Sequence, residues 1–221
     1  DDYELIVFPG GFLDGDDLGA AQACVNRIKH SIVHGERLLD KFLRFLENGK
    51  LVLGICNGFQ LLVKLGLLPA LNSDYTKRNF SLTGNDSGRF EDRWVNLRVD
   101  QKTPCIFTRN MTDIYLPVRH GEGKIVAASP EMVDDVIDRG QAVLYYTSPK
   151  TLLPTMDYPW NPNGSIKSIA GLCDTTGRVF GLMPHPECYL ERTHHPRWTR
   201  EELSEEGDGL MFFKNAALYL S

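Results

Sequence analysis

The chain has 221 residues, of which 42% are hydrophobic, and its formal net charge is −5. This length suits one large α/β domain with a full core better than two small ones. The acidic balance, without any run of lysines or arginines, excludes the basic footprint expected of a protein that binds nucleic acid or an anionic membrane surface.

The cysteines and the absence of long apolar runs point to a cell compartment. Five cysteines are spread over the chain, at positions 24, 56, 105, 173 and 188, and no Cys-x-x-Cys pair occurs. This odd number and wide spacing argue against a disulfide framework and fit a reducing environment. No apolar run reaches the roughly 18 residues that a membrane span requires, and no signal peptide pattern opens the chain. We therefore expect a cytoplasmic protein without a membrane partner.

The first part of the chain alternates short apolar runs with helical patterns. Strands are expected at residues 4–8 and 51–55, and helices within 18–33, over 36–48 and from 59 to 65. A strand–helix alternation of this kind is typical of a parallel sheet whose connections cross over its faces. The first strand ends at Pro9-Gly10-Gly11, which predicts a tight turn.

The middle of the chain changes character and predicts added antiparallel strands. Strand-like segments lie at residues 90–99, 113–118, 124–128 and 141–147, with a short helix near 131–138. Segments 168–173 and 178–183 flank a turn at 174–177 and read as a hairpin, and a last helix covers about 209–220. We therefore expect a single α/β domain with three layers: an open, mostly parallel sheet, extended by antiparallel strands, with helices on both faces.

The segment Gly54-Ile55-Cys56-Asn57-Gly58 joins an apolar strand to a helix and predicts a nucleophile elbow. A side chain at the tip of such a turn stands clear of the sheet, and glycines on both sides let the backbone arms pack without Cβ clashes. The amides at the helix start would stabilise a thiolate at Cys56. The alternative is a small buried cysteine, as most free cysteines are. The paired glycines favour the nucleophile.

A thiolate nucleophile needs a base and an acidic group that orients the base. His185 and Glu187 lie two residues apart, so on an extended segment their side chains would point the same way, and the flanking prolines would stiffen that segment. The alternative is a solvated histidine and glutamate at a strand end. The elbow favours the catalytic interpretation.

An oxyanion hole would complete such a site. The N–H of Asn57, directly after the nucleophile, is the first expected donor, and the N–H of Gly11, in the turn after another predicted parallel strand, is the second. A Gly-Gly pair after a strand is often only a turn, and Cys56 is what favours the donor role.

No metal site is expected. His194 and His195 sit in a polar segment without a partner carboxylate or thiol at a convincing spacing, so we expect them to be solvated. Asp14, Asp16 and Asp17 resemble a calcium-binding loop only superficially, because the regular ligand order and the twelfth-position glutamate are missing.

Three motifs resemble the signatures of class I (triad) glutamine amidotransferases: Phe-Pro-Gly-Gly-Phe at 8–12, Gly-Ile-Cys-Asn-Gly-Phe-Gln at 54–60 and Met-Pro-His-Pro-Glu at 183–187. Within that class, segments 85–91, 120–123, 161–165 and 183–186 resemble the glutaminase subunits of phosphoribosylformylglycinamidine synthase, which act in purine synthesis. The resemblance covers nearly the whole chain and implies the flavodoxin-like fold of that class.

The resemblance also implies roles for individual residues. It implies that Cys56 is the nucleophile, His185 the base and Glu187 its orienting partner, with Gly11 and Asn57 at the oxyanion. Glutamine itself would be held by Gln60 and by the loop containing His120, Gly121 and Glu122, although residues 120–123 could equally form a plain hairpin loop.

The implied reaction releases ammonia from glutamine through a cysteine thioester and delivers it to a synthetase subunit, with a small accessory subunit in the complex. This chain has no Gly-x-x-x-x-Gly-Lys-Ser/Thr loop, so we expect ATP and Mg²⁺ on the synthetase and no cofactor here. Two alternatives remain: a class I glutaminase that serves another acceptor, in a GMP or chorismate-derived pathway, and a non-catalytic docking or regulatory subunit. The intact Cys56, His185 and Glu187 count against the latter.

The chain departs from the family pattern at two places. Members usually begin with a further strand and helix, which are absent here, so we expect a sheet with an uncovered edge at the first strand. Many members also carry arginine after Met-Pro-His-Pro-Glu, where this chain has Cys188.

Overall fold

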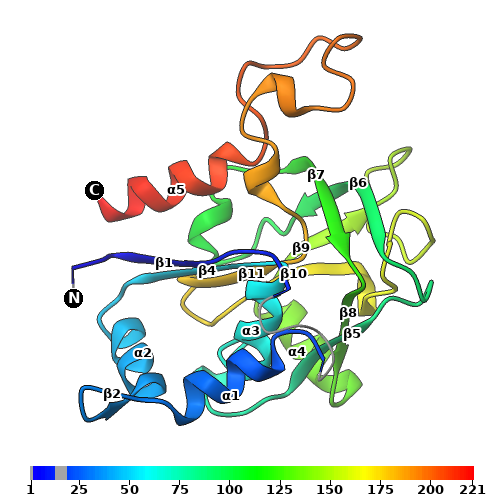
Figure 1. The fold of residues 1–221 in the computed structure, drawn as a ribbon. Helices are drawn as coiled ribbons and strands as arrows, with labels where there is room; N and C mark the ends of the chain where they lie inside the picture. Colours follow the sequence, from blue (N-terminus) through cyan, green and yellow to red (C-terminus); the bar gives the residue numbers. More distant parts are fainter. Residues whose placement is uncertain (1, 13–18) are drawn as a thin grey trace.

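The computed structural model describes residues 2–12 and 19–221. Its centre is a seven-stranded sheet in the order β1-β4-β11-β10-β9-β6-β7, with helices on both faces (Figure 1). These strands are β1 Leu5–Phe8, β4 Leu51–Ile55, β6 Glu91–Val99, β7 Asp113–His120, β9 Ala142–Thr147, β10 Ile169–Cys173 and β11 Val179–Leu182. The predicted α/β fold class with three layers is confirmed.

Helices α1 to α4 lie on one face of the sheet and α5 lies on the other (Figure 1). Their bounds are α1 Gln22–His30, α2 Leu38–Glu47, α3 Asn57–Leu65, α4 Pro130–Asp138 and α5 Leu210–Leu220. Two small sheets accompany them, β2 Ile32–Val33 with β3 Glu36–Arg37 and β5 Phe80–Gly84 with β8 Glu122–Ala127. Among the described residues, no helix has the length and apolar character needed to cross a membrane.

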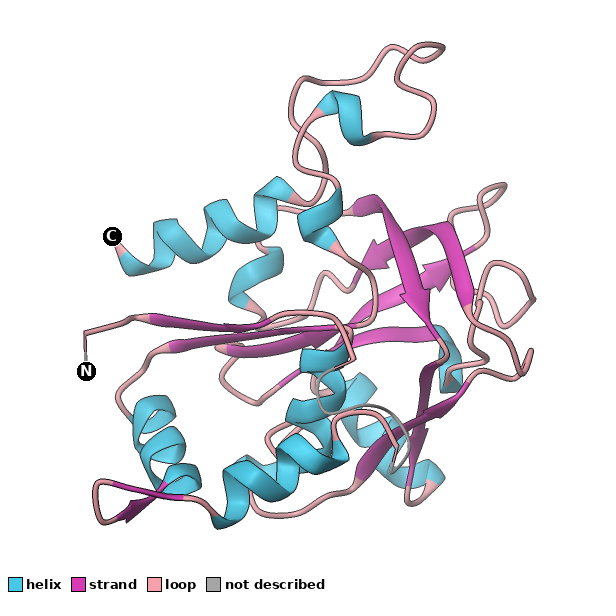
Figure 2. Ribbon diagram, viewed as in Figure 1, coloured by secondary structure: helices cyan, strands magenta, loops and turns pink. Residues whose placement is uncertain are grey.

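The sheet is more mixed than the sequence led us to expect. Only the β1–β4 and β4–β11 pairs are parallel, and the pairs β11–β10, β10–β9, β9–β6 and β6–β7 are antiparallel. The predicted hairpin of β10 and β11 is one cause, because its short turn forces antiparallel pairing. Figure 2 shows the strands β6 and β7 curling away from the flat part of the sheet, where β1 and β4 lie.

Two short strands differ from the predicted elements. Residues 36 and 37, expected to open the helix that follows, instead pair with β2, because His34 and Gly35 both take positive φ and form a tight hairpin turn. The sequence reasoning also missed β5, in which Phe80 and Leu82 are buried and alternate with more exposed residues. This alternation is the signal of a half-buried strand.

Strand β4 and helix α3 form the centre of the core. All five residues of β4 and all nine of α3 are buried. Because buried polar groups need hydrogen-bond partners, the polar side chains of α3 reach neighbouring loops: Gln60 donates to the Glu122 carbonyl and Lys64 to the Ala20 carbonyl. Helix α3 is thereby fixed against β8 and the start of α1.

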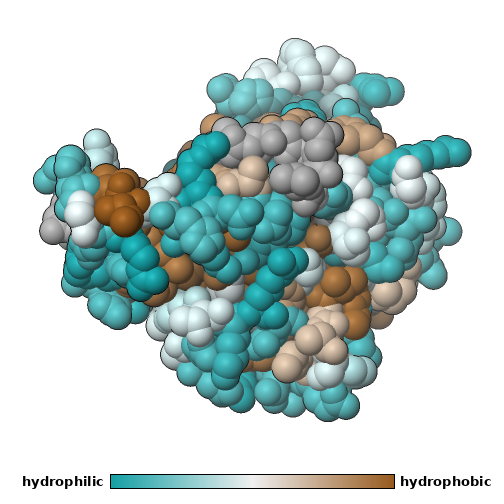
Figure 3. All heavy atoms as spheres, turned by 60° about the horizontal axis from the view of Figure 1, so that its bottom comes forward, coloured by the Kyte–Doolittle hydropathy of each residue, from teal (hydrophilic) through white to brown (hydrophobic). Residues whose placement is uncertain are grey.

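The outer faces of the molecule differ from this core. Figure 3 shows the face that carries α1 to α4, on which, outside the residues drawn in grey, hydrophobic side chains emerge only in small separate groups. The larger apolar side chains of α2, such as Phe42 and Leu46, are buried beneath this face. Strand β1 forms one edge of the sheet, and Val7 on it is 39% exposed.

Candidate active site

Cys56 occupies the sharp turn between β4 and α3. Its backbone has φ 51° and ψ −103°, a combination that a residue with a side chain adopts only under strain. The Cys56 N–H donates to the Leu182 carbonyl at 2.8 Å, and the Cys56 carbonyl accepts from the Gln60 N–H at 3.0 Å. Strain of this kind costs about 1–3 kcal/mol and is concentrated at functional sites. The structure therefore has the nucleophile elbow that the sequence predicts.

The two glycines that flank Cys56 allow the surrounding backbone to pack closely. A Cβ atom at Gly54 would lie 2.7 Å from the Gly58 carbonyl oxygen, and one at Gly58 would lie 2.0 Å from the Phe8 carbonyl oxygen. Both separations are too short for any side chain. The end of β1, the end of β4 and the start of α3 can meet only because these positions are glycine.

His185 and Glu187 follow β11 and form a hydrogen-bonded pair. The distance between His185 Nδ1 and Glu187 Oε1 is 2.6 Å, and the His185 N–H donates to the Pro117 carbonyl of β7. The prediction that this segment is extended is wrong, because Pro186 begins a short 3₁₀ helix, η4 (Pro186–Cys188). Proline favours the first position of a helix, since its φ is already helical and it lacks the N–H that would be left unpaired. The two side chains meet nevertheless.

The surroundings of His185 favour its charged form. Burial lowers its pKa, but the neighbouring Cys56 thiol and the Glu187 carboxylate outweigh burial and raise the pKa to about 9. Because Glu187 occupies Nδ1, the ring nitrogen left for the thiol is Nε2, which is buried and has no other hydrogen-bond partner among the described residues. The Cys56 Sγ lies 3.6 Å from the Arg119 carbonyl oxygen. This arrangement places a nucleophilic thiol beside its general base.

The glycine turn after β1 lies directly against this pair. A Cβ atom at Gly10 would lie 2.8 Å from His185 Cε1 and 3.4 Å from Cys56 Cβ, so Gly10 leaves the room that the imidazole occupies. Gly11 has φ +135°, which only glycine adopts readily. Gly11 and Asn57 line one pocket of about 390 Å³. Asn57 also begins α3, so its N–H has no partner within the helix.

Gln60 and Glu122, both predicted to bind substrate, contact one another. The Gln60 side-chain amide donates to the Glu122 carbonyl oxygen, and its carbonyl accepts from Asn57 Nδ2 at 3.1 Å. The Glu122 carboxylate accepts from the Ala20 N–H at 3.2 Å and lies 3.9 Å from Lys64 Nζ. The start of β8 is thus joined to the start of α3.

His120 ends β7 and is only 2% exposed. Burial, and to a smaller extent the charge of His185, lowers its pKa to about 4, so the ring is neutral near pH 7. Its Nδ1 pairs with Asn85 Oδ1 at 3.0 Å, and the same oxygen accepts from the Gly123 N–H. Residues 120–123 are therefore no plain hairpin loop, because β7 pairs with β6 whereas β8 pairs with β5.

Segment 161–165 completes this buried network. Asn163 Nδ2 donates to the Gly123 carbonyl at 2.8 Å and to the Tyr146 hydroxyl at 3.1 Å, and the Ser165 hydroxyl accepts from the Ile125 N–H. Sequence reasoning assigned no role to Asn85, Asn163 or Tyr146. The signal in the sequence was the two segments 85–91 and 161–165, which contain these asparagines and carry the resemblance to the glutaminase subunits.

His194 and His195 differ in how deeply they are buried. His195 was expected to be solvated, and this is wrong: it is 4% exposed and packs against the rings of Trp94, Tyr115 and Tyr189. Its aromatic neighbours come from distant parts of the chain, so the local polar sequence concealed its burial. The side chain of His194 is more exposed, and its Nδ1 accepts from the Leu190 N–H. Asp14, Asp16 and Asp17 lie outside the described residues.

Comparisons with known proteins agree with this site. The family described as CobB/CobQ-like glutamine amidotransferase domain matches residues 1–220. The phosphoribosylformylglycinamidine synthase subunit PurQ of Dehalococcoides mccartyi is 47% identical over 215 residues, which are 97% of this chain and 79% of that protein. The PurQ of Archaeoglobus fulgidus is 41% identical over an alignment of 227 positions, which covers 99% of this chain and 79% of that protein.

A solved structure extends the likeness to three dimensions. The structure of PurLQS from Thermotoga maritima matches with a TM-score of 0.71 and 33% identity, covering 100% of this chain and 82% of that one. Its fold and that of this chain therefore agree over the whole described region. The chain belongs to the PurQ family of class I glutamine amidotransferases.

Proposed function

We propose that this chain is the glutaminase subunit of phosphoribosylformylglycinamidine synthase in purine synthesis. The observation that carries the proposal is the strained Cys56 elbow beside the His185–Glu187 pair, in a chain of which 97% aligns with a PurQ relative at 47% identity. A non-catalytic docking subunit would have no need of a strained cysteine or of an oriented imidazole.

The reaction divides into two acyl-transfer steps. The Cys56 thiolate attacks the side-chain amide carbon of glutamine, and the N–H groups of Gly11 and Asn57 stabilise the negative oxygen that forms. The His185 imidazolium then gives its proton to the departing ammonia, which leaves a glutamyl thioester on Cys56. In the second step neutral His185 removes a proton from water, the hydroxide attacks the thioester, and glutamate and the thiolate are released.

The buried network positions the substrate. The carboxylate of Glu122 is partly exposed, so we propose that it contacts the glutamine amino group, whereas the side chains of Gln60 and His120 are buried. We propose that Gln60, His120 and Gly121 hold the start of β8 in place. Glutamine specificity would then depend on the network from Asn85 to Asn163 as well as on the triad.

A synthetase subunit is the proposed partner, with a small accessory subunit, and the likeness to the structure of PurLQS from Thermotoga maritima supports a multi-subunit complex. ATP and Mg²⁺ would act there. Two exposed aromatic rings lie beside the site: Phe12 is 59% exposed and Phe90 54%, and their centroids are 6.3 Å apart. Phe12 follows the Gly11 turn, and Phe90 lies against Gly121. A partner that covers these rings would close the loops on both sides of Cys56.

Partner docking should therefore control the glutaminase activity. We expect the isolated chain to release ammonia slowly, and release to rise at least about tenfold when synthetase, ATP and formylglycinamide ribonucleotide are added, because docking completes the site. Ammonia release with and without the partner measures this. Full activity of the chain alone would contradict gating, and rescue of a guanine but not of a purine auxotroph would assign another acceptor.

Glu187 should set the alkaline limit of the reaction. Acylation needs the His185 imidazolium as the proton donor, so kcat/KM for glutamine should fall above about pH 9, the pKa of His185. Glu187 raises this pKa, so in Glu187→Gln the alkaline fall should move to lower pH, with a lower maximum. A pH profile of kcat/KM measures both changes. An unmoved alkaline limb in the variant would show that Glu187 does not support the imidazolium.

A further inference from the structure

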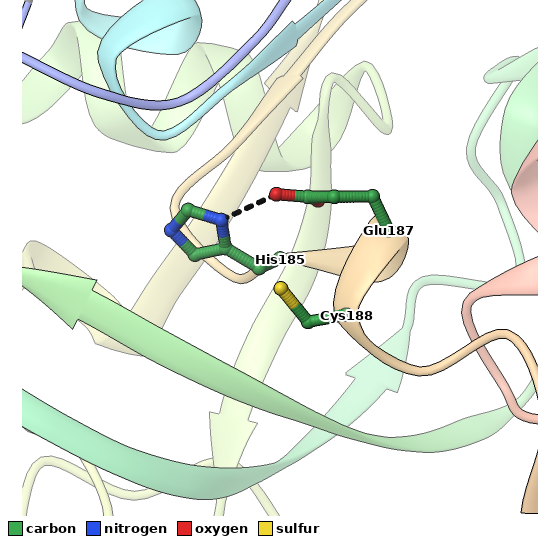
Figure 4. A group of neighbouring side chains, drawn as sticks. All are labelled: His185, Glu187 and Cys188. Carbon is green, nitrogen blue, oxygen red and sulfur yellow. Dashed lines mark hydrogen bonds and ion pairs between the residues drawn. The ribbon is translucent and has the colours of Figure 1, made fainter. Parts of the chain in front are cut away.

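A thiol outside the catalytic triad lies beside the His185–Glu187 pair. Cys188 lies in the short helix η4, as Glu187 does. One ligand atom from each of His185, Glu187 and Cys188 lies within 4.8 Å of the other two. Figure 4 shows the three side chains converging, with Nδ1 facing Glu187 and the second ring nitrogen pointing away from it. Imidazole, carboxylate and thiolate are the three ligand types that zinc prefers.

We propose that these three side chains form an inhibitory site for a thiophilic divalent cation such as Zn²⁺. A bound cation would prevent the His185–Glu187 pair from acting in catalysis. The inhibition rests on the proposed glutaminase function, whereas binding of the metal does not. The site differs from the catalytic machinery in one residue, Cys188, to which the proposed reaction gives no part.

The geometry needs only a small adjustment. With Zn–S near 2.3 Å and Zn–N and Zn–O near 2.0–2.2 Å, tetrahedral ligand atoms lie about 3.3–3.7 Å apart. His185 Nδ1 and Glu187 Oε1, which lie 2.6 Å apart, must separate by somewhat under about 1 Å, whereas Cys188 Sγ must approach them by roughly 1 Å. Rotation of the partly exposed Cys188 and Glu187 side chains supplies both movements. His185 is held by its backbone and by the surrounding core, so the two mobile ligands would adjust their positions around the fixed one.

The charges nearby decide how a cation enters. Arg119 Nη1 donates to Cys188 Sγ at 3.3 Å, so the guanidinium must leave before a cation binds. The Arg119 side chain is 48% exposed and pairs with Asp92 across 3.6 Å, so solvent and that carboxylate can receive it. Three protein ligands leave the fourth position of the metal to water, as in exchangeable rather than structural zinc sites.

Binding at this site would stop acylation. A cation on Nδ1 and on the Glu187 carboxylate replaces the 2.6 Å hydrogen bond between them. The positive metal also opposes a second positive charge on the ring, so the imidazolium that protonates ammonia no longer forms. Glutamine hydrolysis would be lost, while synthesis from added ammonia, which needs only the synthetase, would continue.

Cobalt binding tests the site without any activity measurement. Co²⁺ added to the purified chain should give a thiolate-to-cobalt charge-transfer band that Zn²⁺ abolishes and that a chelator removes. We expect the band to persist in Cys56→Ser and to disappear in Cys188→Ser. A band that depends on Cys56 and survives in Cys188→Ser, or no band in the folded wild-type chain, would overturn the proposal. Cys188→Ala, checked by circular dichroism, replaces Cys188→Ser if that variant does not fold.

Inhibition of the complete complex tests the consequence. Zn²⁺ should inhibit glutamine-dependent synthesis but not ammonia-dependent synthesis, and Cys188→Ser should raise the inhibitory Zn²⁺ concentration at least about tenfold while retaining metal-free activity. Equal inhibition of the variant and wild type would overturn the regulatory role. Cobalt binding at Cys188 in a chain whose complex with the synthetase shows no glutaminase activity would instead contradict the proposed function and leave the metal site standing.

Discussion

Replacing Cys56 with alanine should lower glutamine hydrolysis by about 10,000-fold or more, the largest effect that we expect of any single substitution. The substitution removes the atom that forms the thioester, and residues that act as one catalytic unit lose nearly all of their effect together. In the complex with the synthetase, glutamine-dependent synthesis should be lost, whereas synthesis from added ammonium salt should stay close to the wild-type rate.

Cys188→Ser is the matched control for Cys56→Ala. It also removes a thiol close to His185, but one with no part in the proposed acyl transfer. With metal removed, we expect its glutaminase activity to stay within about twofold of the wild type. Steady-state ammonia release and the ammonia-dependent reaction, measured on both variants, make the comparison. Substantial glutamine hydrolysis by Cys56→Ala would show that the nucleophile lies elsewhere.

Local sequence patterns were enough to predict the elbow. An apolar run, a glycine on each side of Cys56 and a helical pattern define a strand, a sharp turn and a helix within a dozen residues, and the structure has all three. The hairpin of β10 and β11 was equally local, and it delivers His185 to the site. Such features are predictable because their cause, backbone conformation and hydrophobic period, lies within the segment itself.

The buried polar network could not be predicted in the same way. Asn85, His120 and Asn163 are separated by 35 or more residues and meet only because β7 and β8 belong to different sheets. No local pattern states which loops will meet. The finer family resemblance pointed to these segments, but it gave no contacts, and the neutral state of His120 follows from burial that the sequence does not display.

The glycine turn after β1 shows the same limit at shorter range. The sequence predicts Gly11 as an oxyanion donor, and its positive φ and the pocket that it shares with Asn57 suit that role. Sequence reasoning overlooked Gly10, whose importance comes from the His185 ring that lies 2.8 Å from where its Cβ would be. A residue's conformational need can be inferred from its own segment, but steric crowding by a residue 175 positions away cannot.

Gly58→Ala should test whether this crowding holds the site together. The added Cβ would lie 2.0 Å from the Phe8 carbonyl oxygen, a distance that no relaxation of a flexible side chain can relieve, because the atom it meets is backbone. The end of β1 must move away from α3, so we expect the free energy of unfolding to fall by about 3 kcal/mol or more. Gly11 would move with β1 and leave Asn57, so kcat should fall even in the folded fraction.

Gly84→Ala is the control for Gly58→Ala, because it makes the same chemical change where the added Cβ has no heavy atom within 4 Å. We expect the free energy of unfolding of this variant to stay within about 0.5 kcal/mol of the wild-type value, and its glutaminase activity to be retained. Chemical denaturation of both variants compares their stabilities, and kcat is measured at a temperature where each is folded. If Gly58→Ala were as stable and active as Gly84→Ala, the close approach of β1 to α3 would not be what positions Gly11 and Asn57. If it were stable but inactive, the crowding would act on the geometry of the oxyanion donors rather than on folding.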